Sequence, residues 1–243
     1  FGASNNVGPY HIIQSAKQRV AFVVAHPDDE AMFFWPTLLN LHKAGSALFV
    51  LCLSTGNADG LGATRIMEMR KSCKSVGVEG DDLLILDEAQ LQDGFRSWPV
   101  EVVSAHVLDF VQRRKIDIVV TFDQGGVSGH PNHVSTSIGV CHAQGVAAAD
   151  AGGKTTCFRL FLLQTLGLPL KYLGPLGLLP TTTGPCCSCW NPLACIRALA
   201  VHWSQLVWYR VLFALFSRYA YANFYDEYHS PRVTSSAKEK KGD

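Results

Sequence analysis

The stretch that most constrains this chain is Ala25-His26-Pro27-Asp28-Asp29-Glu30, which directly follows the apolar residues 20–24. The apolar run has the length of a buried strand. A proline followed by acids is typical of a helix start, because the positive end of the helix dipole favours negative charge. Adjacent His and Asp side chains are also ligands for divalent metals, and a second carboxylate is then available as a base. The stretch alone supports an ordinary acidic helix start and a metal or acid/base site equally well.

Apolar runs of strand length alternate with helical patterns over residues 19–163. The alternation predicts βαβ units, and therefore an α/β fold with a mostly parallel sheet, right-handed crossovers and helices on both faces. With 243 residues, 48% of them hydrophobic, the chain suffices for one sizeable core and a single domain. Strands are predicted at 19–25, 46–53, 83–86, 116–122 and 158–163, and helices at 31–44, 63–76, 99–114 and 131–146.

Polar residues follow four of the predicted strands. Ligands of open parallel sheets bind outside the carboxyl ends of the strands, so we expect one site formed by these four loops. The residues are His26, Asp28 and Asp29 after the first strand, Gly56 and Asn57 after the second, Asp87 after the third, and Asp123, His130 and His133 after the fourth.

Two histidines at a predicted helix start strengthen the metal interpretation. His130 and His133 are three residues apart, which places them on one helical face. Together with His26 and Asp29 they form a His/Asp set of the kind that holds a divalent metal with open coordination positions. The spacing does not decide which of Asp28 and Asp29, or of His130 and His133, binds the metal.

These motifs resemble those of the LmbE-like de-N-acetylases. The resemblance rests on the Ala-His-Pro-Asp-Asp-Glu stretch, the Gly56-Asn57 loop, and Thr121-Phe122-Asp123 running into the glycine-rich loop and His130-Pro131-Asn132-His133. It extends from about residue 19 to residue 143 and is strongest to the eukaryotic PIG-L branch, the N-acetylglucosaminyl-phosphatidylinositol de-N-acetylases of glycosylphosphatidylinositol-anchor synthesis. Membership would imply a Rossmann-like fold and bound zinc, or another divalent metal.

The resemblance also implies a role for each residue of the site. By matching position, His26, Asp29 and His133 would be the metal ligands, Asp28 the general base, and His130 the residue that stabilises the oxyanion or passes a proton. Amide hydrolysis needs both metal ligands and a separate base. Bound zinc lowers the pKa of water to about 7, and a carboxylate that does not bind the metal can then accept the proton of that water.

Four further residues are weaker candidates for substrate binding. Arg65 matches the family's Arg-x-x-Glu motif, and contact with an anionic part of the substrate is as well supported as a solvated helix position. Asp93 resembles part of an acidic family loop, although a turn-forming Asp is the simpler explanation. Asp123 is a candidate for orienting a metal-bound histidine. His202 begins a His-Trp-Ser-Gln sequence that resembles a family His-Arg-Ser-Gln.

The resemblance weakens after residue 164. We predict a lead-in segment at 1–17, a catalytic domain at 18–165, a divergent apolar segment at 166–224 and a disordered polar tail at 225–243. Residues 193–224 combine Leu and Val with Trp, Tyr and Arg, which suits a helix in the membrane interface or an ordinary packing helix. A lipid-linked substrate favours the membrane interface. The end Lys240-Lys241-Gly242-Asp243 has the form of a dilysine retrieval signal, or is simply solvated.

Composition disfavours other classes of protein. A net charge of +1 without clustered Lys or Arg gives no basis for a nucleic-acid partner. Carboxylates rather than G-x-G-x-x-G follow the first strand, and they would repel the pyrophosphate of a dinucleotide. Four cysteines crowd residues 186–195, which is weak evidence for a zinc ribbon and for a disulfide framework, and a reducing compartment is the modest preference. The chain begins at Phe1 rather than Met, which is consistent with a processed or truncated form.

The sequence therefore predicts a zinc-dependent de-N-acetylase of N-acetylglucosaminyl-phosphatidylinositol at the cytosolic face of the endoplasmic reticulum membrane. It gives no indication of a protein partner. Two alternatives remain: a de-N-acetylase of a soluble N-acetylglucosaminyl conjugate, and a catalytically silent, membrane-associated interaction protein.

Overall fold

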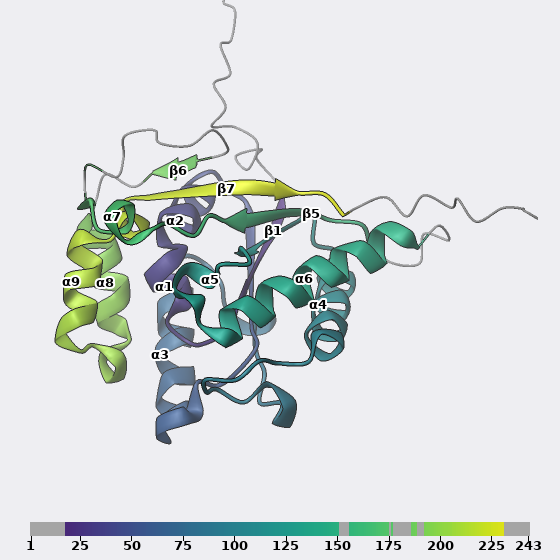
Figure 1. The fold of residues 1–243 in the computed structure, drawn as a ribbon, viewed down its shortest axis with the longest axis horizontal. Helices are drawn as coiled ribbons and strands as arrows, with labels where there is room; N and C mark the ends of the chain where they lie inside the picture. Colours follow the sequence, from purple (N-terminus) through teal and green to yellow (C-terminus); the bar gives the residue numbers. More distant parts are fainter. Residues whose placement is uncertain (1–17, 151–155, 175, 177–185, 189–191, 231–243) are drawn as a thin grey trace, which may run out of the picture.

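The computed structural model describes residues 18–150, 156–174, 176, 186–188 and 192–230. These residues contain one seven-stranded sheet of order β3-β2-β1-β4-β5-β7-β6 (Figure 1). Strands β1 to β5 pair in parallel, whereas β7 is antiparallel to both β5 and β6. The strands are β1 (Arg19–Val24), β2 (Ala47–Cys52), β3 (Leu83–Ile85), β4 (Ile118–Phe122), β5 (Arg159–Leu163), β6 (Cys186–Ser188) and β7 (Ala222–Tyr228).

Helices cover both faces of the sheet, as predicted. Helices α4 (Val100–Arg114) and α6 (Pro131–Ala149) pack together on one face, and α2 (Trp35–Lys43) and α3 (Gly62–Lys74) lie on the other (Figure 1). The remaining α-helices are α1 (Asp29–Phe33), α5 (Gly126–Gly129), α7 (Leu168–Lys171), α8 (Pro192–Val201) and α9 (Trp208–Phe216). Short 3-10 helices are η2 (Asn57–Asp59), η3 (Gly80–Asp82), η4 (Ala89–Leu91), η6 (Trp203–Gln205) and η7 (Arg218–Ala220).

The central strands are mostly apolar because helices bury them from both sides. All five residues of β4 are buried, and so are all residues of β1 after Arg19. Continuous rather than alternating hydrophobicity is expected for a parallel sheet covered on both faces. Edge-to-face and tilted ring contacts join Phe22 to Phe34 and Phe34 to Phe122 across this core. The predicted α/β fold, with a mostly parallel sheet in a single domain, is confirmed.

One predicted helix, at residues 31–44, is divided into α1 and α2. The break lies at Phe34, which has non-helical dihedral angles of φ −115° and ψ 0°. Pro36 explains the break, since proline has no N–H to donate and its ring clashes with the carbonyl four residues earlier. In the first turn of α2 the same proline is tolerated, because those N–H groups have no intrahelical partner.

The C-terminal part of the chain completes the sheet. Strand β7 runs to Tyr228 and Tyr225 is fully buried, so the boundary of a disordered tail at residue 225 is wrong. Pairing with β5 explains this polar strand, because Arg159 Nε donates to Glu227 Oε1 at 2.8 Å. The lead-in at 1–17, the end of the predicted tail with its dilysine sequence, and most of 177–191 lie outside the described residues. None of the helices in the described ranges has the length and hydropathy needed to cross a bilayer.

Asn223 fastens β7 to the segment that follows β1. Its Oδ1 accepts from Thr37 Oγ1 at 2.8 Å, and its Nδ2 donates to the Phe33 carbonyl at 2.7 Å. All of these side chains are buried. The C-terminal strand is thus docked directly against α2 and against α1, which carries Asp29 and Glu30 of the acidic stretch.

We predict that Asn223→Ala lowers the free energy of unfolding by about 1–3 kcal/mol, because buried groups of Thr37 and Phe33 each lose a hydrogen bond. Urea denaturation measures the change. Gln124→Ala, which truncates an exposed amide, is the matched control and is expected to stay within about 0.5 kcal/mol of the parent. Equal effects of the two substitutions would contradict the anchoring role of Asn223.

Candidate active site

The site lies where neighbouring parallel strands β1 and β4 end. Strand order reverses between them, which is the position where open α/β sheets bind ligands. Residues after both strands line one cavity of about 260 Å³. All five residues predicted as metal ligands, base or oxyanion group line it: His26, Asp28, Asp29, His130 and His133. Of the four weaker candidates, Arg65 and Asp93 line the cavity and Asp123 and His202 do not.

The buried Asp29 carboxylate joins the two loops. Its Oδ2 accepts from the backbone N–H groups of Ala25 at 3.0 Å and His26 at 2.8 Å. Its Oδ1 lies 3.2 Å from Nε2 of His133. Burial alone would raise the pKa of Asp29, but the two histidines and the backbone hydrogen bond lower it below its usual value. The carboxylate is therefore held in its charged form.

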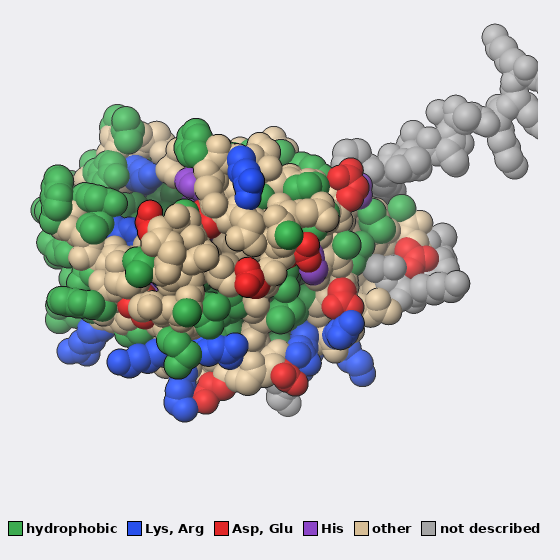
Figure 2. All heavy atoms as spheres, turned by 90° about the horizontal axis from the view of Figure 1, so that it is seen from below, with side chains coloured by type: hydrophobic (Ala, Val, Ile, Leu, Met, Phe, Trp, Pro, Cys, Tyr) green, Lys and Arg blue, Asp and Glu red, His purple; other side chains and the backbone are tan. Residues whose placement is uncertain are grey.

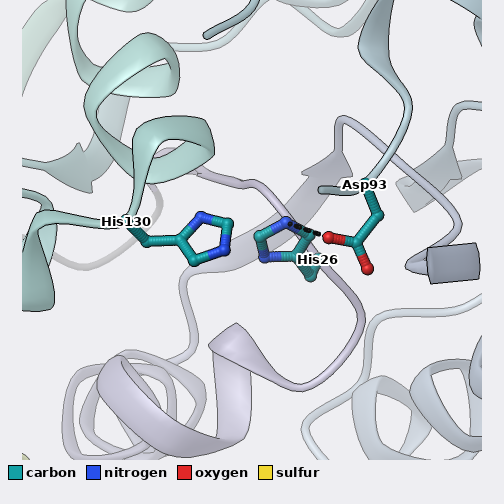
Figure 3. Close-up of side chains that lie close together, drawn as sticks. All are labelled: His26, Asp93 and His130. Carbon is teal, nitrogen blue, oxygen red and sulfur yellow. Dashed lines mark ion pairs between the residues drawn. The ribbon is translucent and has the colours of Figure 1, made fainter. Parts of the chain in front are cut away.

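Hydrogen bonds fix the orientation of both buried histidines. His133 Nδ1 lies 3.1 Å from the Gly126 carbonyl, which makes Nδ1 the donor, and its ring stacks on Phe122. His26 Nε2 lies 3.1 Å from Asp93 Oδ1 (Figure 3). The same nitrogen lies 3.0 Å from Asn132 Oδ1, and both oxygens are acceptors. In their neutral form, rings with these hydrogen bonds have no proton on Nδ1 of His26 and Nε2 of His133, and both atoms face Asp29.

This arrangement fits a divalent metal. The potential ligand atoms of His26, Asp29 and His133 lie within 4.8 Å of one another, and all three residues are buried. A second group, His26, Asp93 and His130, meets the same distance limit (Figure 3). It is less suitable, because Asp93 already accepts the proton on Nε2 of His26. A carboxylate in that position orients a metal-binding histidine and increases its basicity.

Charges around the cavity shift the pKa values of its other groups. Burial lowers the pKa of His26, but the hydrogen bond to Asp93 and the charges of Asp29 and Asp93 leave it above its usual value. Burial raises the pKa of Asp93, yet His26 and Arg65 bring it down to about 2. Burial, with the charges of His26 and His133, lowers the pKa of His130 to about 4.

Asp28 occupies a strained turn that buried groups hold in place. Its φ of 129° lies in the region favoured by glycine, which costs a non-glycine residue about 1–3 kcal/mol. Glu30 Oε2 accepts from the Asp28 N–H at 3.1 Å, and Glu30 Oε1 lies 2.6 Å from His202 Nε2. Glu30 and His202 are both fully buried. His202 therefore supports the turn through Glu30. It does not line the cavity, as a residue that binds substrate would.

Arg65 is buried, with 6% of its surface exposed, so a solvated helix position is excluded. Nη1 donates to the Gly56 carbonyl at 2.8 Å and Nη2 to the Pro27 carbonyl at 3.0 Å. The same two nitrogens lie 3.4 Å from Asp93 and Asp28. Arg65 thus ties together the loops that follow β1 and β2.

Asp123 holds the glycine-rich loop from outside the cavity. Its carboxylate accepts from the N–H groups of Gly125 at 3.0 Å, Gly126 at 3.2 Å and Thr165 at 2.6 Å. Its influence on His133 is indirect, because the Gly126 carbonyl that accepts from that histidine belongs to the loop.

Comparison with known proteins agrees with this geometry. The family described as PIG-L: GlcNAc-PI de-N-acetylase matches residues 21–144. A probable N-acetylglucosaminyl-phosphatidylinositol de-N-acetylase of Dictyostelium discoideum is 33% identical, covering 85% of this chain and 92% of the relative. The Bos taurus enzyme of that name is 36% identical, with 84% and 81% covered.

The chain belongs to the PIG-L family. A more distant relative, the 1D-myo-inositol 2-acetamido-2-deoxy-alpha-D-glucopyranoside deacetylase of Corynebacterium diphtheriae, is 30% identical over 46% of this chain and 47% of its own. Among solved structures, N,N'-diacetylchitobiose deacetylase from Pyrococcus horikoshii has the same fold, with a TM-score of 0.65 at 16% identity, covering 89% of this chain and 88% of that one.

Sequence reasoning missed several residues of this PIG-L site. Asn132 is fully buried, accepts from His26, and donates to the Arg96 carbonyl at 2.7 Å. Its position between the two histidines of the motif was the available signal. Gln205 and Arg210 line the cavity from the C-terminal part of the chain, and Arg210 forms an ion pair with Asp28. No spacing connects these residues to a stretch about 180 residues earlier.

A substitution at Gly56 can show whether the Arg65 side chain is able to move. Gly56 and Gly60 have similar positive φ angles of +67° and +73°. A Cβ on Gly56 would lie 2.5 Å from Cζ of Arg65, whereas one on Gly60 would meet nothing within 4 Å. We predict that Gly56→Ala loses about 1–3 kcal/mol more stability than Gly60→Ala, because only the former adds overpacking to backbone strain. Chemical denaturation compares them, and equal losses would show that the Arg65 side chain yields freely.

Proposed function

We propose that this protein removes the acetyl group of N-acetylglucosaminyl-phosphatidylinositol, yielding glucosaminyl-phosphatidylinositol and acetate in glycosylphosphatidylinositol-anchor biosynthesis. The observation that carries the proposal is the convergence of His26, Asp29 and His133 with Asp28 and His130 on one cavity. Relatives that carry the name of this activity share 32–36% of its sequence over 84–85% of the chain.

His26, Asp29 and His133 would hold the metal, for which zinc suits a set of two imidazoles and one carboxylate. When bound, a divalent cation supplies Lewis acidity that acidifies water and polarises an amide carbonyl. The Gly126 carbonyl and the Asp93 carboxylate keep the two imidazoles in the tautomers that ligation requires.

Asp28 is the candidate base because it lines the cavity and directly precedes the proposed ligand Asp29, whereas Asp93 is already paired with His26. It accepts a proton from the attacking water as the new C–O bond forms. His130 Nδ1 accepts from the Asn132 N–H at 3.2 Å, so Nε2 carries the proton of the neutral ring. That N–H is available to stabilise the developing oxyanion. When the C–N bond breaks, the departing amine takes up the proton that Asp28 accepted, and glucosaminyl-phosphatidylinositol and acetate are released.

An apolar surface beside the cavity suits a lipid-linked substrate. Trp203 and Trp208 are 75% and 74% exposed, and Phe216 is 51% exposed. Figure 2 shows hydrophobic side chains gathered at the end of the molecule that α8 and α9 form. We call this surface the apolar end; its exposed residues are Trp203, Trp208, Tyr209, Val211, Leu212, Leu215 and Phe216.

We propose that the apolar end lies in the membrane interface at the cytosolic face of the endoplasmic reticulum. Tryptophan and tyrosine favour the interface of a bilayer, and contiguous apolar patches of this kind are rare on proteins that contact only water. The inner side of α9 packs through Phe213 and Ala214. Internal packing therefore accounts for one side of α9 and leaves its outer apolar side unexplained.

Removing the metal or the base tests the chemistry. We expect acetate release from N-acetylglucosaminyl-phosphatidylinositol to stop in the presence of a chelator and to return when zinc or another divalent metal is added. Asp28→Asn should lower kcat by about 10²- to 10⁴-fold, the usual contribution of general acid–base catalysis. Asp87→Asn, exposed and away from the cavity, is the control. Full turnover with chelator present, or in Asp28→Asn, would refute the mechanism.

The relative from Corynebacterium supports a second candidate, hydrolysis of a soluble N-acetylglucosaminyl conjugate. Vesicle binding separates the two. Trp208→Ser combined with Phe216→Ser should weaken binding to phosphatidylcholine–phosphatidylinositol vesicles at least about tenfold, since each buried aromatic contributes about 1.5–3 kcal/mol. The matched control is Ile138→Ser with Val146→Ser, two exposed apolar residues of α6. Equal binding by both double variants in a sedimentation assay would favour the soluble substrate.

A further inference from the structure

The two arginines that line the cavity are held in different ways. Arg65 is buried, and both of its Nη atoms donate to backbone carbonyls as well as approaching carboxylates. The side chain of Arg210 is 20% exposed. In the described part of the chain, the partner of its guanidinium is Asp28, which Nη1 contacts. Arg65 is thus committed to holding loops, whereas Arg210 keeps donors for a ligand.

Arg210 lies between the cavity and the apolar end. It belongs to α9 (Trp208–Phe216), and its sequence neighbours Tyr209 and Val211 are exposed residues of that surface. The 3-10 helix η6 is arranged similarly, since Trp203 is exposed and Gln205 lines the cavity. Glu68 holds η6 in place by accepting from the N–H of Ser204 at 2.8 Å and from its Oγ at 2.6 Å.

The parts of the proposed substrate follow the same order as the cavity, Arg210 and the apolar end of the protein. Its acetylated sugar must reach the metal ligands, its acyl chains stay in the bilayer, and its phosphodiester lies between them. Guanidinium groups bind phosphate oxygens through paired, charge-assisted hydrogen bonds. Elsewhere the wall of the cavity is acidic, with Asp28, Asp29, Asp59 and Asp93, and it would repel an anion.

We propose that Arg210 binds the phosphodiester of the substrate and so favours phosphate-bearing over phosphate-free glycosides. The inference rests on the proposed function, and it assigns the phosphate contact to Arg210 where the sequence motif suggests Arg65. Without substrate, Asp28 pairs with the guanidinium of Arg210. When substrate binds, its phosphodiester replaces Asp28 as the partner of the Arg210 guanidinium, and Asp28 keeps its contact with Arg65.

Two water-soluble substrates separate the effect of the phosphate on activity from any effect of membrane binding. They are N-acetylglucosaminyl-inositol and the same glycoside carrying a glycerophosphate diester on the inositol. For Arg210→Gln, we expect the ratio of kcat/KM between the phosphate-bearing and phosphate-free substrates to fall about 10- to 100-fold, as for loss of charge-assisted hydrogen bonds. Arg210→Lys keeps the charge without the planar fork and should lie between the parent and Arg210→Gln.

Arg197→Gln on α8, an exposed arginine away from the cavity, is the matched control and should leave the ratio unchanged. An equal fall for both substrates in Arg210→Gln would mean that Arg210 acts only through Asp28, and would overturn the inference. An unchanged ratio would also overturn it.

Calorimetry provides a readout independent of turnover. Glycerophosphoinositol should bind the parent protein at least about tenfold more tightly than it binds Arg210→Gln, whereas inositol should not distinguish them. If the parent deacetylates neither glycoside, the proposed function fails, while this measurement still decides the role of Arg210. Equal binding of glycerophosphoinositol to parent and variant would refute that role.

Discussion

The parallel pairing of β1 with β4 is the constraint on which the site depends. Parallel strands that lie side by side end at the same edge, so the loops after them must meet there. One loop brings an imidazole and two carboxylates, and the other brings two imidazoles. The buried Asp29 carboxylate then joins the loops, because it accepts from the backbone on its own side and faces His133 on the other. Paired strands thus create the geometry of the candidate metal site, and helix propensity has little part in it.

Buried polar groups outside the cavity keep this geometry fixed. Asp28 sits at a positive φ, a conformation that persists only where surrounding structure enforces it. Glu30 and His202 provide that support with a hydrogen-bonded pair fully removed from water. Because unpaired charges in such a place are strongly unfavourable, the pair and the turn depend on each other. His202 belongs to the described residues 192–230, so the turn at Asp28 and this C-terminal part of the chain support each other.

The charges of the cavity suit one kind of ligand. Carboxylates outnumber guanidinium groups along its wall, which favours a cation at the ligand set and disfavours anions over most of the surface. Of the two arginines that line the cavity, Arg65 is buried among backbone carbonyls, and Arg210 lies where the cavity meets the apolar end. A glycolipid has a sugar, a phosphodiester and acyl chains in that order. This order matches the acidic cavity wall, the basic Arg210 and the apolar end of the protein. A purely soluble glycoside would leave the apolar end without a role.

The sequence by itself determined the fold class and the two halves of the site. Runs such as residues 20–24 and 118–122 are almost wholly apolar, as expected for a parallel sheet covered on both faces, and each of the two histidine motifs comes after such a run. Tertiary structure alone decided the rest. His202, Gln205 and Arg210 reach the site through the docking of α8, η6 and α9, and β7 became a strand by pairing with β5. Contacts between residues about 180 positions apart leave no periodic trace, because periodicity records only which face of its own element a residue occupies.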